Sequence, residues 1–372
     1  MAGTVLSLRE VGRATLARQH LLERTASPAL AEIAHLGGMQ AQAPLAPYVG
    51  LWSRLRDFAI DDLSALYRQR QVVRLALIRS TIHLVTAEDA LAWRALVDPV
   101  IERSTHAAFG RHYQGLDRAA LAEAARELTE QQPRTFAELG RLLAERFPGR
   151  DAAALAQAAR SQLPLVQVPP RGIWGEGGRI AHTTTRAWLG RDPLDEPDLE
   201  AMVRRYLAAF GPASVMDAQA WSGLTRLRAV FDRLRPSLHV TSDENGTPLF
   251  DLPAAPRPDP DVPAPARFLP EYDNLLFSHA DRTRVNPHGY RVPLFPGNGA
   301  ALGYFLLDGI YSGLWRIART TAKGAEASVR LTVQHFAPLS AEHREQLTGE
   351  GLRLLAFLAP RCAPQISFEP VS

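Results

Sequence analysis

One pattern recurs three times along this chain of 372 residues: several short amphipathic helices followed by a pair of short strands. A capping box, Ser7 with Glu10, begins the first helix, and a second one, Thr135 with Glu138, begins a helix of the next block. Alternating or β-branched residues then predict the strand pairs. These pairs are expected at residues 72–85, 172–184 and 239–252. Short helices that end in a small hairpin are typical of winged-helix modules, so we expect an α+β fold with three such modules in tandem.

The helices are expected at residues 8–22, 28–36, 46–55 and 61–68 in the first block, at 116–128, 135–147 and 151–162 in the second, and at 196–210, 214–221 and 224–234 in the third. The second strand pair follows a strand at 165–168 and has a glycine-rich tip. The predicted modules therefore span residues 1–115, 116–195 and 196–253.

The chain from 254 to 372 differs in character. Five prolines between 254 and 265 predict a stiff linker. Beyond it, we expect an antiparallel β-sheet region and a last helix that packs on it. The strands are expected at 303–307, 310–318 and 327–335, and the helix at 340–358.

Composition narrows the class of protein. No stretch of about 18 apolar residues lacks a charge, and the first residues show no signal-peptide pattern, so we expect a cytoplasmic protein. A single cysteine, Cys362, excludes an internal disulfide, and no cluster has zinc-ligand spacing. The net charge of +3 is only mildly basic, but Lys323 is the sole lysine. Arginine suits phosphate and base-edge contacts, although the codon usage of a GC-rich genome would also enrich it.

The segment Gln40-Ala41-Gln42 is the first candidate for chemistry. It follows the helix stop Gly37-Gly38 and precedes a proline. Residues two apart face the same way in an extended segment, so the two amides can meet at one point. Paired amides can orient a water and place carbonyl oxygens beside a developing positive charge. The alternative is that both glutamines are ordinary polar turn residues.

Four segments together resemble the AlkZ-like winged-helix DNA glycosylases. They are residues 36–55, which contain Gln40 and Gln42, and residues 78–85, 268–276 and 278–285. The resemblance extends from about residue 6 to about residue 358. It implies a C-shaped array of three winged helices around a positively lined DNA channel, with Gln40 and Gln42 as the catalytic glutamines. It also implies a β-hairpin that probes the DNA, which we place at 172–184.

The resemblance further implies a monofunctional glycosylase for bulky N7-alkylguanine or N3-alkyladenine adducts, including the unhooking of interstrand crosslinks left by azinomycin. Alkylation at N7 makes the purine cationic and a good leaving group, so no general acid is required. We therefore expect hydrolysis without a β-lyase step and without a metal or cofactor. A crosslinked base is tethered to both strands, so a shallow, open site is expected in place of full base flipping.

A set of basic and polar side chains in the matched segments and the predicted hairpin is expected to contact DNA. The set is Arg54, Arg79, His83, Arg179, His182, Thr183, Arg282 and Arg284. Each has a structural alternative: a histidine is often a core residue, and Arg282 and Arg284 can pair with Asp281. Asp273 and Glu271 are candidates for a general base or for structural carboxylates. The expected partner is double-stranded DNA, bound by a monomer that needs no membrane and no obligate protein partner.

Two other function classes remain open. A transcriptional regulator would use the same winged helices without catalysis, and it would bind DNA without releasing a base. A drug-sequestering protein would bind the free alkylating agent in the absence of DNA. Three modules together with a Gln-x-Gln segment favour the enzyme.

Overall fold

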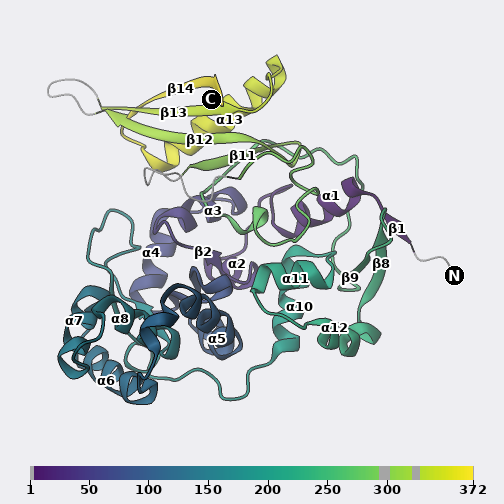
Figure 1. Ribbon diagram of the computed structural model, residues 1–372. Helices are drawn as coiled ribbons and strands as arrows, with labels where there is room; N and C mark the ends of the chain where they lie inside the picture. Colours follow the sequence, from purple (N-terminus) through teal and green to yellow (C-terminus); the bar gives the residue numbers. More distant parts are fainter. Residues whose placement is uncertain (1–3, 293–301, 321–326, 372) are drawn as a thin grey trace.

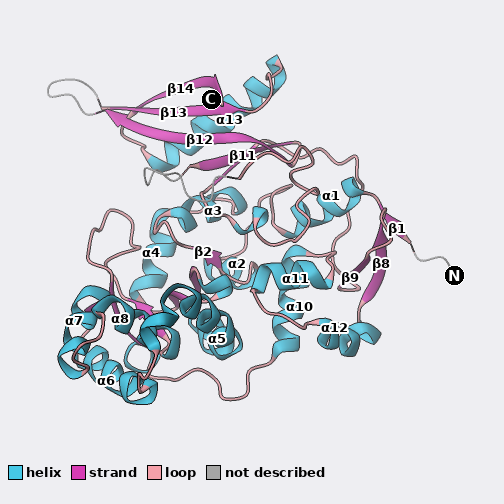
Figure 2. Cartoon of the chain, viewed as in Figure 1, coloured by secondary structure: helices cyan, strands magenta, loops and turns pink. Residues whose placement is uncertain are grey.

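The computed structural model describes residues 4–292, 302–320 and 327–371 (Figure 1). Helices dominate the first two thirds of the chain, and the last third contributes a sheet that lies as a separate layer at one side of the molecule (Figure 2). The α+β character predicted from the sequence is confirmed. Short helices followed by a strand pair also occur in three successive stretches of the chain, although the first begins later than expected and the strand pair of the second is shifted.

The first block begins at α2. Its elements are α2 (Ala29–His35), β2 (Met39–Gln40), α3 (Ala46–Arg54), α4 (Ile60–Arg68), β3 (Val72–Ala76) and β4 (Ile82–Thr86). The short strand β2 pairs antiparallel with β4. Helix α2 ends where Gly37 and Gly38 adopt positive φ angles of 65° and 87°. The Gly-Gly stop is thus confirmed, because a left-handed residue after the last turn satisfies free helix carbonyls.

The second block repeats this order of elements. They are α6 (Arg118–Gln131), β5 (Arg134–Thr135), α7 (Phe136–Arg146), α8 (Ala152–Gln162), β6 (Leu165–Gln167) and β7 (Ala181–Thr184), followed by α9 (Thr185–Leu189). The hairpin expected at 172–184 is corrected. Its strands are β6 and β7, and the glycine-rich residues 172–180 lie in the loop between them. Glycines favour turns and open loops over ladder pairing, which explains the difference.

The third block comprises α10 (Leu199–Phe210), α11 (Val215–Ser222), α12 (Arg228–Leu234), the 3-10 turn η3 (Arg235–Ser237), β8 (His239–Asp243) and β9 (Pro248–Asp251). The predicted turn at Asn245-Gly246 joins β8 and β9, with Gly246 at φ 78°. Between α10 and α11, where the other blocks have a short strand, a single bridge pairs Ala213 with Phe250.

The first two blocks share one sheet, since the strand order β2-β4-β3-β6-β7-β5 runs from one into the other. The long helix α5 (Ala87–Phe109) and the 3-10 turn η2 (Gly110–Tyr113) connect them. Helix α5 was not among the predicted elements. Its buried side chains Trp93, Val97 and Ile101 pack in one cluster with Tyr206 and Trp221 of the third block. This helix therefore holds the third block against the first.

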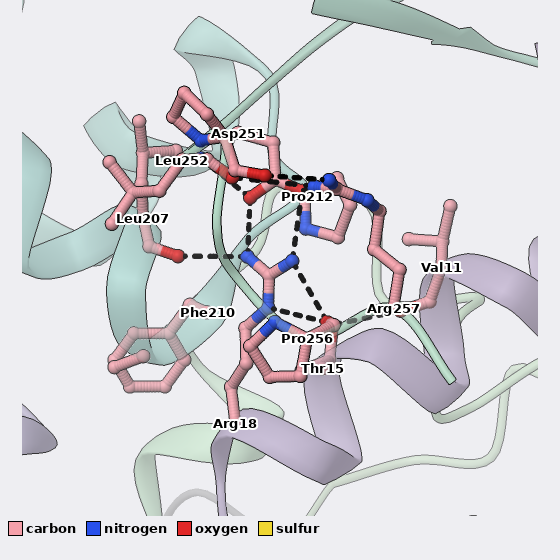
Figure 3. Close-up of polar contacts among 12 residues, drawn as sticks. Val11, Thr15, Arg18, Leu207, Phe210, Pro212, Asp251, Leu252, Pro256 and Arg257 are labelled. Carbon is pink, nitrogen blue, oxygen red and sulfur yellow. Dashed lines mark hydrogen bonds and ion pairs between the residues drawn. The ribbon is translucent and has the colours of Figure 1, made fainter. Parts of the chain in front are cut away.

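The N-terminal segment packs far from its neighbours in sequence. Strand β1 (Val5–Leu6) pairs in parallel with β8, and α1 (Leu8–Arg18) begins at the predicted Ser7 capping box. At the end of α1, the guanidinium of Arg18 donates to both carboxylate oxygens of Asp251 at 2.6 and 2.9 Å, with both side chains fully buried (Figure 3). The same guanidinium donates to the carbonyl of Leu207. In space, residues 5–18 thus lie with the third block.

The C-terminal sheet has five strands in the order β10-β11-β12-β13-β14. The elements are β10 (Arg267–Leu269), the 3-10 turn η4 (Asn274–Leu276), β11 (Gly303–Leu307), β12 (Ile310–Thr320), β13 (Ser328–His335), α13 (Ala341–Leu358) and β14 (Ala363–Pro370). The predicted strands and helix are confirmed, and strands β10 to β13 pair antiparallel as expected. The sequence patterns did not indicate the last strand, β14. Strand β14 runs parallel to β13, because α13 forms a crossover between them.

Candidate functional site

The Gln-Ala-Gln segment is held rigidly at the edge of the six-stranded sheet. Gly38 precedes it in the left-handed region, and a Cβ there would stand 2.4 Å from Val85 Cγ1, so only glycine fits. Ala41 is fully buried, and its backbone N–H donates to the carbonyl of Ile82 at 2.8 Å. From the other side, Arg74 Nη2 donates to the carbonyl of Ala41 at 2.8 Å. The backbone between the two glutamines therefore has little freedom.

The two glutamine side chains lie on either side of buried Ala41. Gln40 is half-buried and Gln42 is exposed. Gln40 Oε1 accepts from Arg79 Nη2 at 2.9 Å, whereas Gln42 Oε1 accepts from the backbone N–H of Ile82 at 3.4 Å, which is long for a hydrogen bond. Gln40 thus contacts the turn between β3 and β4, and Gln42 contacts the first residue of β4. That their amides meet at one point stays a prediction.

Arg79 occupies that turn, the 3-10 segment η1 (Ile78–Ser80), in a strained conformation. Its φ is 53° and that of Ser80 is 61°, a region that costs a residue with a side chain about 1–2 kcal/mol. Arg79 Nη1 donates to the carbonyl of Trp221 at 2.7 Å, and Arg160 Nη2 donates to that of Ser80 at 2.7 Å. Contacts with two other blocks therefore hold the turn in this shape.

Arg79 is a cation whose bonded partners are all neutral. Its Nη2 donates to Gln40 Oε1 and to Asn274 Oδ1, each at 2.9 Å, and within residues 4–292, 302–320 and 327–371 no carboxylate pairs with it. Burial, together with repulsion from the nearby Arg282, lowers its pKa to about 10, so it stays charged at neutral pH. An uncompensated, half-buried positive charge is suited to an anion such as a backbone phosphate.

Asn274 is a candidate site residue that was not predicted from the sequence. It begins η4, is buried, and its Nδ2 donates to the carbonyl of Gly38 at 3.2 Å. Together with Gln40, Gly38 and the neighbouring Asp273, it lines one small pocket. Its position inside the matched segment 268–276 could have identified it. Only the two carboxylates of that segment, Glu271 and Asp273, were considered as candidates.

Arg54 and Arg284 do not lie where the sequence analysis expected. Arg54, 1% exposed, donates to both oxygens of Asp273 at 2.8 and 2.9 Å and to Gln19 Oε1 at 3.0 Å. Arg284 is buried against Asp217 and donates to the carbonyl of Pro212 at 2.8 Å. A phosphate cannot reach either guanidinium without breaking an internal ion pair, so we correct both DNA-contact predictions. Asp273 is accordingly a structural carboxylate.

His83, His182 and Thr183 are also buried, which corrects their predicted contact with DNA. Burial and the Arg79 charge lower the pKa of His83 to about 3, so it is neutral. The His182 ring stacks on Phe136 with centroids 4.0 Å apart, and burial lowers its pKa to about 4. Thr183 Oγ1 donates to the carbonyl of Thr129. All three are fixed in the sheet. His182 and Thr183 are neighbours in β7 and therefore face opposite sides of it, so both faces of this strand are covered.

Arg179 and Arg282 are the predicted DNA contacts that are exposed. Arg179 lies on the loop 172–180, with its side chain 73% exposed and paired with Glu138. Arg282 lies close enough to Arg79 to lower its pKa. With Arg79, these residues are the members of the predicted set that solvent reaches. No group of His, Cys, Asp or Glu in the described ranges could hold a metal ion, and none of the described helices is long and apolar enough to cross a membrane.

Comparison with known proteins finds one matching family and a similar solved structure. The family model "AlkZ-like: DNA glycosylase AlkZ-like" matches residues 33–357. Among solved structures, Streptomyces sahachiroi DNA glycosylase AlkZ is similar with a TM-score of 0.75 at 18% sequence identity, over 98% of this chain and 100% of that chain. No curated protein sequence matches. At this identity the structural likeness shows the fold, and the family match covers the three segments that contain Gln40, Arg79 and Asn274.

Proposed function

Since the chain belongs to the AlkZ-like DNA glycosylase family, we propose that it hydrolyses the N-glycosidic bond of bulky N7-alkylated purines in duplex DNA. The proposal includes the unhooking of interstrand crosslinks, and with it self-resistance to an alkylating natural product such as azinomycin. It is a monofunctional reaction that leaves an abasic site, without a lyase step and without a cofactor.

One observation carries the proposal: two solvent-accessible glutamines flank buried Ala41, and one of them, Gln40, is bonded to a cation that has no carboxylate partner among the described residues. Arg79 attracts a DNA phosphate, and Gln40 and Gln42 then face the sugar next to it. Neither glutamine side chain is bound to a carboxylate in the part of the chain that the structure describes. Neutral amides suffice only for a base that is already a good leaving group, and N7 alkylation makes the purine one.

The rest of the fold supports DNA binding. We infer that the three blocks, each with helices, a short strand or bridge, and a strand pair, are winged-helix modules arranged as a C around the duplex. Arg79, Arg179 and Arg282 then contact phosphates, and the loop 172–180 probes the DNA. Phosphate contacts carry no sequence information, so little sequence preference is expected. The enzyme acts as a monomer in the cytoplasm.

The experiment that tests this function is release of 7-methylguanine from methylated duplex DNA, followed by a panel of N7 adducts of increasing size. We expect release of the free base, an abasic strand that is cut only after alkali, and activity that persists with bulky adducts. Gln40→Ala and Gln42→Ala should each lower the rate by about 100-fold, as loss of a positioned polar group does in other enzymes. Binding without release, unaffected by either substitution, would indicate the regulator instead.

A further inference from the structure

We infer that the two glutamines act differently: Gln40 donates its amide N–H2 to the leaving purine, and Gln42 offers its carbonyl oxygen to the attacking water. Arg79 and Asn274 are positioning residues that lock Gln40 in the donating orientation. This inference rests on the proposed glycosylase function and deepens it. It follows from the different hydrogen bonds that the two side-chain amides make.

The orientation of Gln40 is set by the chemistry of arginine. A guanidinium has only donors, so the amide group that faces Arg79 Nη2 at 2.9 Å must be the oxygen. The amide nitrogen therefore points away from Arg79. It has no hydrogen-bond partner among the described residues, and the side chain is only half-buried, so this donor is available to a ligand.

A closed ring of hydrogen bonds holds this orientation. Gly38 accepts from Asn274 Nδ2 at 3.2 Å, Asn274 Oδ1 accepts from Arg79 Nη2 at 2.9 Å, and the same Nη2 donates to Gln40. Gly38 and Gln40 are two residues apart, so the ring starts and ends on the same segment. Rotation of the Gln40 amide by 180° would point its N–H2 at the guanidinium, donor against donor. The ring therefore permits one orientation only.

In Gln42, by contrast, the carbonyl oxygen is the group that is available to a ligand. Its oxygen has a single long contact of 3.4 Å, to the backbone N–H of Ile82, and the side chain is exposed. An amide oxygen has two lone pairs, so at least one can accept from a water. The cation Arg79 is bonded to Gln40 and not to Gln42, which leaves the Gln42 oxygen as the more electron-rich group toward a developing oxocarbenium ion.

The reaction balances with these roles. The C1′–N9 bond breaks with its electron pair going to N9, which neutralises the alkylated purine. The water oxygen forms the new bond to C1′, and its proton leaves to solvent after being oriented by Gln42. As N9 gains the electron pair, the acceptor atoms of the purine become more electron-rich, so a donor from Gln40 bonds more strongly in the transition state than in the ground state.

A matched pair of isosteric substitutions tests the assignment, with Gln40→Glu and Gln42→Glu compared with the two alanine variants. The readout is the single-turnover release of 7-methylguanine from duplex DNA. A carboxylate keeps the acceptor and loses the donor. We therefore expect Gln42→Glu to react at least about tenfold faster than Gln42→Ala, and Gln40→Glu to be as slow as Gln40→Ala, within about twofold. The reverse order, or equal effects at both positions, would overturn the inference.

The positioning role is tested with Asn274→Ala. We expect a slower single-turnover rate, unchanged affinity for undamaged duplex, and no further loss when it is combined with Gln40→Ala, because both act on one amide. Additive losses would mean that Asn274 acts only through the fold. Thermal unfolding of every variant serves as the folding control. A wild-type protein that releases no alkylpurine would overturn the proposed function, whereas an active one with symmetrical glutamines overturns only this inference.

Discussion

The buried ion pair between Arg54 and Asp273 gives a prediction that separates a structural arginine from a DNA-binding one. We consider Arg54→Met, Asp273→Asn and the double variant. Methionine preserves most of the apolar stem of Arg54, and asparagine retains an oxygen for the backbone N–H of Leu275, which Asp273 Oδ1 accepts at 3.1 Å. The substitutions therefore remove the charges and keep most of the packing, while Arg54→Met also removes the hydrogen bonds to Gln19 Oε1 and to the carbonyl of Gly50.

The structure sets the magnitude. The two side chains are 1% and 3% exposed and share two charge-assisted hydrogen bonds of 2.8 and 2.9 Å. Removing one partner leaves the other charge buried and unpaired, which costs about 3–5 kcal/mol of the free energy of unfolding. Removing both leaves no unpaired charge, so the double variant should be destabilised by less than the sum of the single variants, by about 2 kcal/mol or more.

Two measurements check this. Urea unfolding followed by tryptophan fluorescence gives the free energies for the cycle. The salt dependence of duplex binding gives the number of phosphate contacts, because each one contributes about 0.9 to the slope of log K against log salt. We expect Arg54→Met to leave that slope unchanged and Arg282→Ala to lower it by about 0.9. Additive stabilities, or a lower slope for Arg54→Met, would refute the structural assignment.

Three further predictions concern stability and the loop. The pKa of His83 is lowered from 6.5 to about 3, so between these pH values this histidine binds a proton only in the unfolded chain. The free energy of unfolding therefore falls as the pH drops below 6.5. In urea titrations, His83→Gln should flatten this dependence by about 1.4 kcal/mol per pH unit. Gly38→Ala, with φ 87° and no room for a Cβ, should lose more than about 2 kcal/mol and slow base release, while Gly246→Ala, at φ 78° in open space, should lose only about 1 kcal/mol. Tyr48→Phe removes the hydroxyl that donates to Gly172 and accepts from Trp174, so the loop 172–180 should become more sensitive to trypsin.

Each of these has an outcome that would contradict it. An unchanged pH dependence for the His83 variant would mean that another group accounts for acid sensitivity. Equal losses at Gly38 and Gly246 would show that the backbone angle matters and the contact with Val85 does not. Cleavage of the loop at the wild-type rate in the Tyr48 variant would show that the hydroxyl is not its anchor.

Most local elements of this protein could be predicted from its sequence. Capping boxes, the Gly37-Gly38 stop and alternation in the strands act over a few residues, so most helices and strand pairs lie where these signals predicted. The resemblance also picked out the segments that contain Gln40, Arg79 and Asn274, although only two of these residues were named. Helix α5 was missed because its local signals were overlooked. Residues 172–180 were predicted to be part of a strand pair, but their glycines favour a loop.

Which side chains are free to act depends instead on contacts between distant parts of the chain. Arg54 and Arg79 are both arginines in matched segments, yet Arg54 meets a carboxylate 219 positions away in the chain while Arg79 meets only neutral groups. The direction of β14 and the packing of α1 on the third block were likewise set by distant contacts. Whether a charge is paired or free depends on what the fold brings within about 4 Å of it, and neighbouring residues in the sequence do not contain that information.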